Sequence, residues 1–256
     1  MIETKYIKSL AKKGERADGR ALDEYRQPIE VEYGASAKNA EGSALVRIGE
    51  TVVIAGVKME LGEPYSDRPD EGTIMVNVEM LPLSSPKFES GPPGIDAIEL
   101  ARVVDRAIRE SKAIDMKGLC LVPGEKMWTV IIDIYPLNSA GNLFDASSLA
   151  AMAALKNTRL PAVVDGKIDY KHRTDEGLPL AKDALECTVY KIENSFFIDP
   201  TVEEEEAVDA RLTVGVTQEG HICAMQKGGY EPLTEEDIKM MVGLAIKKTA
   251  ELRKVL

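Results

Sequence analysis

The sequence predicts an α+β fold built from two similar halves. Two observations carry this prediction: paired β-rich segments are followed by a long helical segment, and this plan occurs twice along the 256 residues. No repeat of roughly 20–50 residues indicates a solenoid instead. We expect an N-terminal helix and loop over residues 1–28, a first half over 29–165 and a second half over 166–256, with a connector near 161–182.

The N-terminal part is expected to contain a short helix, a loop, a strand and a hairpin. Residues 3–13 place apolar and lysine side chains with helical spacing, and residues 16–28 form a loop. Residues 29–35 are expected to form the first strand. Two β-branched runs within residues 42–61 flank Gly49-Glu50. A two-residue turn with glycine first is typical of a type II′ hairpin.

The rest of the first half alternates strands and helices. Residues 73–81 alternate apolar and polar side chains, as in a half-buried strand. Residues 91–111 are expected to form one amphipathic helix. Residues 126–135 are almost continuously apolar, which indicates a central strand. A tight turn of small residues at 138–142 then leads into an alanine-rich helix over 143–157.

The second half repeats this plan. Two hairpins are expected, the first over residues 183–199 and the second over 208–227 with its turn at Glu219-Gly220. The closing helix covers 234–256. Thr234 is expected to be its N-cap, with Asp237 completing a capping box.

Composition excludes several classes of function. The net charge of −11 is unusual for a protein that binds nucleic acid by itself, so a polyanion must meet a local basic patch or a site completed by another chain. Three separated cysteines without C-x-x-C spacing favour reduced thiols in a cytoplasm over disulfides or zinc. The chain has two histidines, which makes a histidine-based metal site or a Ser/His triad unfavoured. We expect neither a membrane span nor a secretory signal.

The helix over 91–111 has two unlike faces at about 100° per residue. One broad arc is apolar and comprises Leu100, Ala101, Val103, Val104, Ala107 and Ile108. Arg102, Arg106 and Arg109 lie together on the opposite side. Three acidic residues border this arginine row: Glu99, Asp105 and Glu110. One interpretation is a solvated, ion-paired helix face; the other is a row of bidentate donors for phosphates.

Two other stretches are candidate sites. Backbone amides at the 139–142 turn, where a helix begins, are able to hold a phosphate. The turn matches neither G-x-G-x-x-G nor a Walker A loop, and Asp145 in the first helical turn competes with an anion, so a plain helix start is favoured. Glu203–Glu206 and Asp209 are candidates for magnesium binding or general acid catalysis, against a solvated acidic turn.

Taken together, long motifs resemble the RNase PH family of 3′→5′ phosphorolytic exoribonucleases. They are ERADGR at 15–20, the hairpin GSALVRIGETVVIAGVK, the helix AIELARVVDRAIRES, the strand-turn-helix at 130–155 and the final helix. More narrowly, FESGPP, AIELARVVDR, DIYPLNSAGN and IDPTVEEEE resemble the non-catalytic RNase PH-like subunits of the archaeal exosome ring. The resemblance implies an RNase PH-like fold of the ribosomal-protein-like βαβα type.

The sequence departs from active members of that family where they bind phosphate. Active members carry paired arginines just ahead of the helix, where this chain has Ile95-Asp96. Their Gly-Gly-Ser/Thr-Arg loop is replaced by residues 140–143. Losing one such electrostatic interaction typically costs about 10²–10³ in rate. The family's catalytic aspartate aligns approximately with Glu203, with Asp209 six positions on. We expect no catalytic residue, metal or cofactor; the alternative is an autonomous phosphate-dependent exoribonuclease using these two carboxylates with magnesium.

The resemblance also implies partners and a role for the arginine row. In the non-catalytic subunits the matching arginines face the RNA channel, which makes Arg102 and Arg106 expected contacts of single-stranded RNA, with Arg109 at the flank. The implied assembly is a cytoplasmic archaeal ring of three heterodimers with a catalytic RNase PH-like partner and RNA-binding cap subunits. A third alternative, an interaction module that never touches RNA, predicts that these arginines pair with the neighbouring acids.

Overall fold

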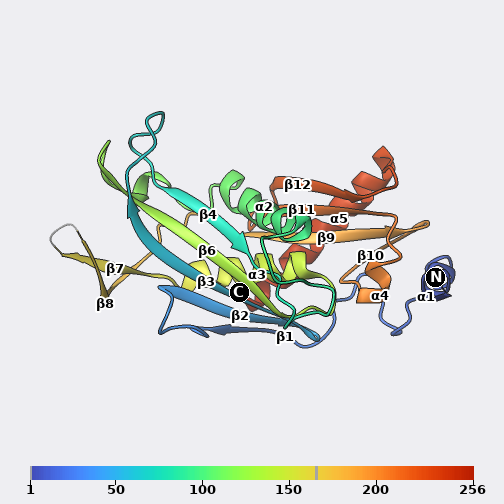
Figure 1. The fold of residues 1–256 in the computed structure, drawn as a ribbon. Helices are drawn as coiled ribbons and strands as arrows, with labels where there is room; N and C mark the ends of the chain where they lie inside the picture. The colour runs from blue at the N-terminus through green and yellow to red at the C-terminus, as the bar shows by residue number, and fades with distance from the viewer. Residues whose placement is uncertain (1, 165–166) are drawn as a thin grey trace.

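The computed structural model describes residues 2–164 and 167–256. The first half forms a mixed sheet in the order β1-β2-β3-β6-β4, with β5 paired to β6 (Figure 1). Its strands are β1 (Ile29–Tyr33), β2 (Gly42–Ile48), β3 (Thr51–Gly62), β4 (Thr73–Val78), β5 (Cys120–Val122) and β6 (Lys126–Asn138). Only the β4–β6 pairing in this sheet is parallel. The central position expected for the apolar strand β6 is confirmed.

The expected hairpin of the first half is confirmed as β2 and β3. Gly49 has a φ of 56°, whereas the φ of Glu50 is not positive. A Cβ atom on Gly49 would lie 2.6 Å from the Cβ atom of Arg26, so the turn needs glycine for space as well as for conformation.

The second half forms an antiparallel sheet in the order β10-β9-β11-β12. Its strands are β9 (Ala184–Ile192), β10 (Ser195–Ile198), β11 (Ala210–Thr217) and β12 (Ile222–Gly229). Both expected hairpins are confirmed, and Gly220 has a φ of 81° in the turn between β11 and β12.

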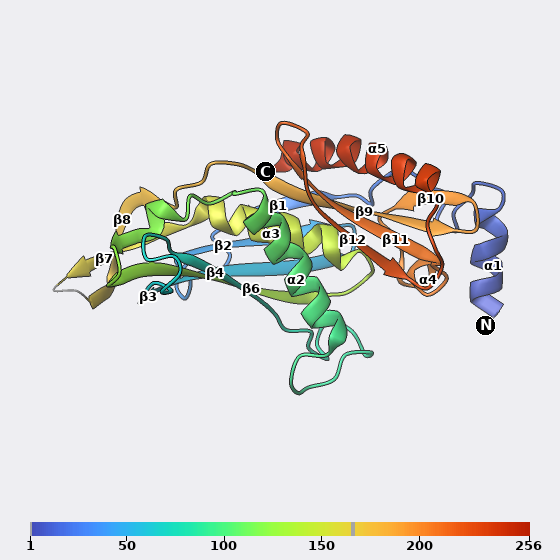
Figure 2. The same cartoon turned by 90° about the horizontal axis from the view of Figure 1, so that it is seen from above.

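Helices join the two sheets into one hydrophobic core. They are α1 (Ile2–Ala11), α2 (Ile95–Glu110), α3 (Leu143–Asn157), α4 (Val202–Glu205) and α5 (Glu235–Leu252), with 3₁₀ turns η1 (Lys117–Leu119) and η2 (Arg253–Val255). α2 and α3 each contact strands of both sheets and lie between them, while α5 packs on β9 and β11 (Figure 2). α3 is buried along most of its length because its alanines permit close packing. The capping box of Thr234 and Asp237 at the start of α5 is confirmed.

α2 differs from its expected bounds. The helix begins at Ile95, and Gly94 is an extended N-cap with φ −74° and ψ 176°. Pro92 and Pro93 disfavour helical backbone in the residues before them, which explains the later start. The apolar arc is confirmed at five of its six positions; Ala101 is half-buried, and Ala97 is an additional buried residue.

The expected connector is a hairpin in the structure. β7 (Arg159–Val164) and β8 (Lys167–Gly177) form a separate two-stranded antiparallel sheet that extends from one end of the molecule (Figure 1). Its register shifts on both sides of Pro161, which disrupts the alternation by which strands are predicted. The expected boundary between the halves at residues 165 and 166 lies outside the described residues.

α1 lies at the opposite end of the molecule, beside β10 and α4 (Figures 1 and 2). Its Ile7 and Ala11 pack into a small second cluster with residues of β9 and β10. The three cysteines are free thiols. Among the described residues, no helix combines the length and the apolar character needed to cross a membrane.

Candidate nucleic-acid interface

The arginine row of α2 divides into accessible and occupied side chains. Arg102 is exposed and has no hydrogen-bond or ion-pair partner among the described residues. Arg106 is half-buried and donates from Nη1 to Oε1 of Gln226 on β12, at 2.9 Å. Arg109 donates to both carboxylate oxygens of Asp105, at 3.1 and 2.8 Å, and to the backbone oxygen of Ile74 at 3.1 Å. Arg102 and Arg106 therefore form no ion pair among the described residues, whereas the charge of Arg109 is paired with that of Asp105.

Internal ion pairing explains only one end of this row. Glu99 pairs with Arg211 of β11 at 2.6 Å instead of with the row. The Arg211 guanidinium also stacks over the ring of Phe144, 4.4 Å from its centroid. Of the acids expected to neutralise the row, Asp105 alone pairs with a row arginine in the part of the chain that the structure describes. The fully ion-paired interpretation therefore holds for Arg109 and not for Arg102 or Arg106.

The turn before α3 is occupied by groups of this chain. Asn142 adopts left-handed backbone with φ 57°, and its N–H donates to Oε1 of Glu205 at 2.8 Å. Gly141 has a φ of 99°, and a Cβ atom there would lie 2.3 Å from the Pro200 carbonyl oxygen. A carboxylate at a helix N-terminus is favoured by the helix dipole. The sequence favours a plain helix start over a phosphate site. In the structure, the Glu205 carboxylate of the same chain binds the amide at this helix start.

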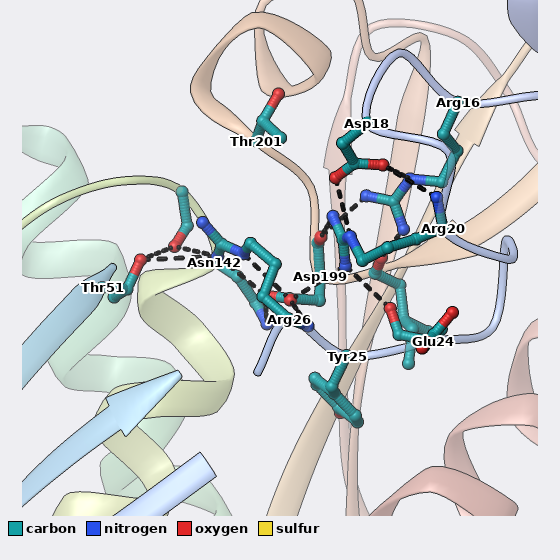
Figure 3. Close-up of polar contacts among 12 residues, drawn as sticks. Arg16, Asp18, Arg20, Glu24, Tyr25, Arg26, Thr51, Asn142, Asp199 and Thr201 are labelled. Carbon is teal, nitrogen blue, oxygen red and sulfur yellow. Dashed lines mark hydrogen bonds and ion pairs between the residues drawn. The ribbon is translucent and has the colours of Figure 1, made fainter. Parts of the chain in front are cut away.

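The Asp199 carboxylate lies beside this turn and is hydrogen-bonded to it (Figure 3). Asp199 is fully buried and accepts hydrogen bonds from Arg20 at 3.2 Å, from Arg26 at 2.8 and 3.0 Å, and from the Asn142 side chain at 3.0 Å. Arg26 also donates to the carbonyl oxygens of Ala140 and, at 3.1 Å, of the following glycine. These bonds tie the N-terminal loop, the end of β10 and the start of α3 into one network.

The ERADGR motif at residues 15–20 holds α4 in position through Arg16. Arg16 donates to both carboxylate oxygens of Glu204 in α4, at 2.9 and 2.6 Å, and both side chains are buried. It also donates to the backbone oxygens of Ile198 and Asp199. The motif therefore fixes the position of α4, a role that the sequence alone did not reveal because its partners lie more than 180 residues away.

The acidic stretch 203–206 does not converge on one point. Glu204 faces Arg16, Glu205 faces the Asn142 amide, and Glu206 is ion-paired with Lys87. Within the described residues, no three histidine, cysteine or acidic side chains are arranged to hold a metal ion.

Asp209 lies apart from the Glu203–Glu206 stretch. It pairs with Lys8 of α1 at 2.6 Å and accepts a hydrogen bond from the Glu193 N–H at 2.6 Å. Desolvation opposes ionisation of this carboxyl, but these hydrogen bonds outweigh it and lower the pKa of Asp209. Glu203 and Asp209, which the autonomous-enzyme alternative pairs, therefore have different surroundings: Glu203 is exposed, and Asp209 is committed to α1.

A recess of about 500 Å³ opens between the start of α2, the 139–143 turn and α4. Its charged lining consists of Lys87, Asp96, Glu99, Glu205, Glu206 and Arg211. Both basic residues are ion-paired with acids of the same lining, whereas Asp96 and Glu205 form no ion pair among the described residues. Desolvation raises the pKa of Glu205, and the hydrogen bond from Asn142 acts in the opposite direction. This lining disfavours a phosphate group.

Comparisons with known proteins agree with the sequence motifs. The model of the 3′ exoribonuclease family, domain 1, matches residues 25–161, and that of domain 2 matches residues 185–248. The exosome complex component Rrp42 of Methanothermobacter thermautotrophicus is 47% identical over 98% of this chain and 93% of its own length. The protein of the same name from Methanocella arvoryzae is 48% identical over 100% and 95%.

The comparison with solved structures agrees with the sequence comparisons. A chain of the Archaeoglobus fulgidus exosome with RNA bound to the active site is 44% identical, covers 99% of this chain and 97% of its own, and superposes with a TM-score of 0.91. A chain of an archaeal exosome core is 41% identical, covers 99% and 95%, and has a TM-score of 0.87. Rice Rrp46, at 18% identity and a TM-score of 0.71, shares the fold.

Proposed function

Because the chain belongs to the 3′ exoribonuclease (RNase PH) family, we propose that it is the Rrp42-type subunit of an archaeal exosome, which binds RNA and supports catalysis by an RNase PH-like partner. Identity of 47% over almost the full length of both chains supports this assignment. The observation that carries the division of labour is a contrast between α2 and the turn before α3. Arginine donors are free on α2, while a carboxylate of the chain fills the turn at 140–143.

Arg102 and Arg106 are the proposed RNA contacts. They are four residues apart on α2, so both project from one side of the helix. Phosphate contacts position a strand without reading its sequence, as a complex that degrades many RNAs requires. Arg109 is already bonded to Asp105, so we assign it a supporting place at the flank of the row. The net charge of −11 is compatible with this role because only a local basic patch meets the RNA.

The lack of catalysis by this chain is proposed on electrostatic grounds. Phosphorolysis must hold orthophosphate beside a phosphodiester, which brings two anions together. The Glu205 carboxylate accepts the Asn142 N–H at 2.8 Å, and the recess carries more acidic than basic groups. Asp209 is paired with Lys8, which speaks against its use with Glu203 as a magnesium-dependent pair. We therefore assign the chemistry to the partner subunit.

The proposed assembly is a ring of three heterodimers with RNA-binding cap subunits, in the cytoplasm of an archaeon. Within this chain, residues 1–28 form the N-terminal arm, and the two RNase PH-like halves meet within the 161–182 segment. The hairpin of β7 and β8 occupies most of that segment and separates the two main sheets in sequence.

Activity of the reconstituted complex tests this function. A 5′-labelled single-stranded RNA is incubated with orthophosphate and the chain alone, the partner alone, or both. We expect phosphate-dependent shortening from the mixture and none from this chain. The double variant Glu203→Gln/Asp209→Asn, built in this chain only, should leave the activity of the mixture intact. Robust shortening by the isolated chain, lost in that variant, would establish the autonomous enzyme instead.

A further inference from the structure

Beneath the arginine row lies a buried acid that the proposed function does not use. Glu186 of β9 is 1% exposed, and neither of its carboxyl oxygens has a hydrogen-bond partner among the described residues. Buried polar groups are almost always hydrogen-bonded, and an unpaired buried carboxylate is costly. The position therefore calls for a physical explanation.

The acid shares a small void with Arg106. The void lies between α2, β9, β11 and β12 and is lined by Val103, Arg106, Glu186, Thr213, Ala224, Met225 and Gln226. Gln226 accepts from Arg106 Nη1 at 2.9 Å, and no other hydrogen-bond partner of this arginine lies in the described residues. Gln226 thus holds the guanidinium at the rim, and Glu186 lies on the inner side of the same void.

We propose that Gln226 and Glu186 are positioning residues for Arg106: Gln226 keeps its guanidinium at the RNA-facing surface, and Glu186 draws it inward when ionised. The inference rests on the proposed function, in which this arginine contacts RNA. An uncharged acid leaves the arginine free for phosphate, whereas a carboxylate competes with phosphate for the same donors. Arg102 does not line this void, so it serves as the internal reference.

The surroundings of Glu186 determine when it ionises. Burial and, second, the Asp145 carboxylate of α3 raise its pKa to about 8, and Arg106 of α2 acts in the opposite direction. From β12 the neutral Cys223 thiol faces this acid, and burial raises the pKa of that thiol to about 11. From α5, the buried Lys248 acts on the neighbouring Cys187 and is ion-paired with Glu251 at 2.8 Å. The guanidinium is thus the nearest positive charge able to respond to ionisation of Glu186.

RNA binding tests the role of Gln226. Dissociation constants for a single-stranded RNA are measured with the assembled ring in phosphate-free buffer, which prevents phosphorolysis. Gln226→Ala should weaken binding about two- to ten-fold, the range typical of one hydrogen bond. The same substitution in an Arg106→Ala background should have no further effect. Equal weakening in both backgrounds would overturn the proposal.

Chemical labelling tests the inward movement without RNA, and so separates this inference from the proposed function. Phenylglyoxal modification of Arg106 is followed by peptide mass spectrometry between pH 7 and 9, and its rate is divided by that of Arg102. We expect the ratio to fall above about pH 8 in the unmodified sequence and to stay constant in Glu186→Gln, with Gln226→Ala changing the ratio already at pH 7. A constant ratio in the unmodified sequence would refute the proposal even if both arginines bind RNA.

Discussion

Removing Arg102 and Arg106 of α2, the two row arginines without an ion pair among the described residues, should change the salt dependence of RNA binding. Each phosphate contact on a single strand contributes about 0.7 to the slope of log K against log salt. Arg102→Ala/Arg106→Ala therefore lowers the slope by about 1.4 if both make one contact. Raising the salt from about 50 to about 200 mM should then weaken the unmodified ring about seven-fold more than the variant ring.

The control is Arg109→Ala, which removes one positive charge from the same helix, half of what the double variant removes. Because Arg109 is bonded to Asp105 and to the backbone oxygen of Ile74, this variant should keep the slope of the unmodified ring. Fluorescence anisotropy with a labelled single-stranded RNA at five salt concentrations gives both slopes. An equal loss of slope per arginine removed, about 0.7 in Arg109→Ala and about 1.4 in the double variant, would refute the reasoning, since general charge would then explain the effect. An unchanged slope in the double variant would refute the RNA contacts themselves.

Two further predictions concern the buried acids. Asp199→Ala leaves the guanidinium of Arg26 without its ion-pair partner, and breaking a buried pair in this way typically costs about 3–5 kcal/mol. We therefore expect a lower midpoint in urea unfolding. The control Asp18→Ala removes an exposed ion pair and should cost under about 1 kcal/mol. Glu186 has a folded-state pKa of about 8, raised by burial and by Asp145, so the folded state binds its proton more tightly than the unfolded chain does. The free energy of unfolding should therefore fall as the pH rises from about 4.5 to about 8, and Glu186→Gln should lose a few kcal/mol of that change. Identical pH profiles of the two proteins in urea unfolding would contradict the assigned burial of an ionisable Glu186.

Local patterns predicted most of the elements because the relevant forces act between near neighbours. The glycine-first turn at Gly49 and the capping box at Thr234 are decided within four residues. The apolar arc of α2 follows from helical spacing alone. The start of α2 was predicted four residues early because helical periodicity does not register the two prolines. The β7–β8 hairpin was missed because its register shifts around Pro161.

The site was predictable only in part. The sequence identified the arginine row of α2, and long motifs identified the family. It left open which arginines are neutralised. Arg109 pairs one helical turn away, within reach of sequence reasoning, whereas the partner of Arg106 is 120 residues away. No spacing signal connects Arg106 with Gln226 or with Glu186.

The sequence by itself determined most of the secondary structure, the family and the place of the arginine row on α2. Only the tertiary structure decided how the charges are used. It brought Glu205 to the Asn142 amide across 63 residues and Asp199 to three donors from different segments. The physical reason is range: turns, caps and amphipathic faces depend on neighbours in the chain, whereas an ion pair depends on how sheets and helices pack. The contact between Glu205 and the Asn142 amide can therefore be recognised only from the fold.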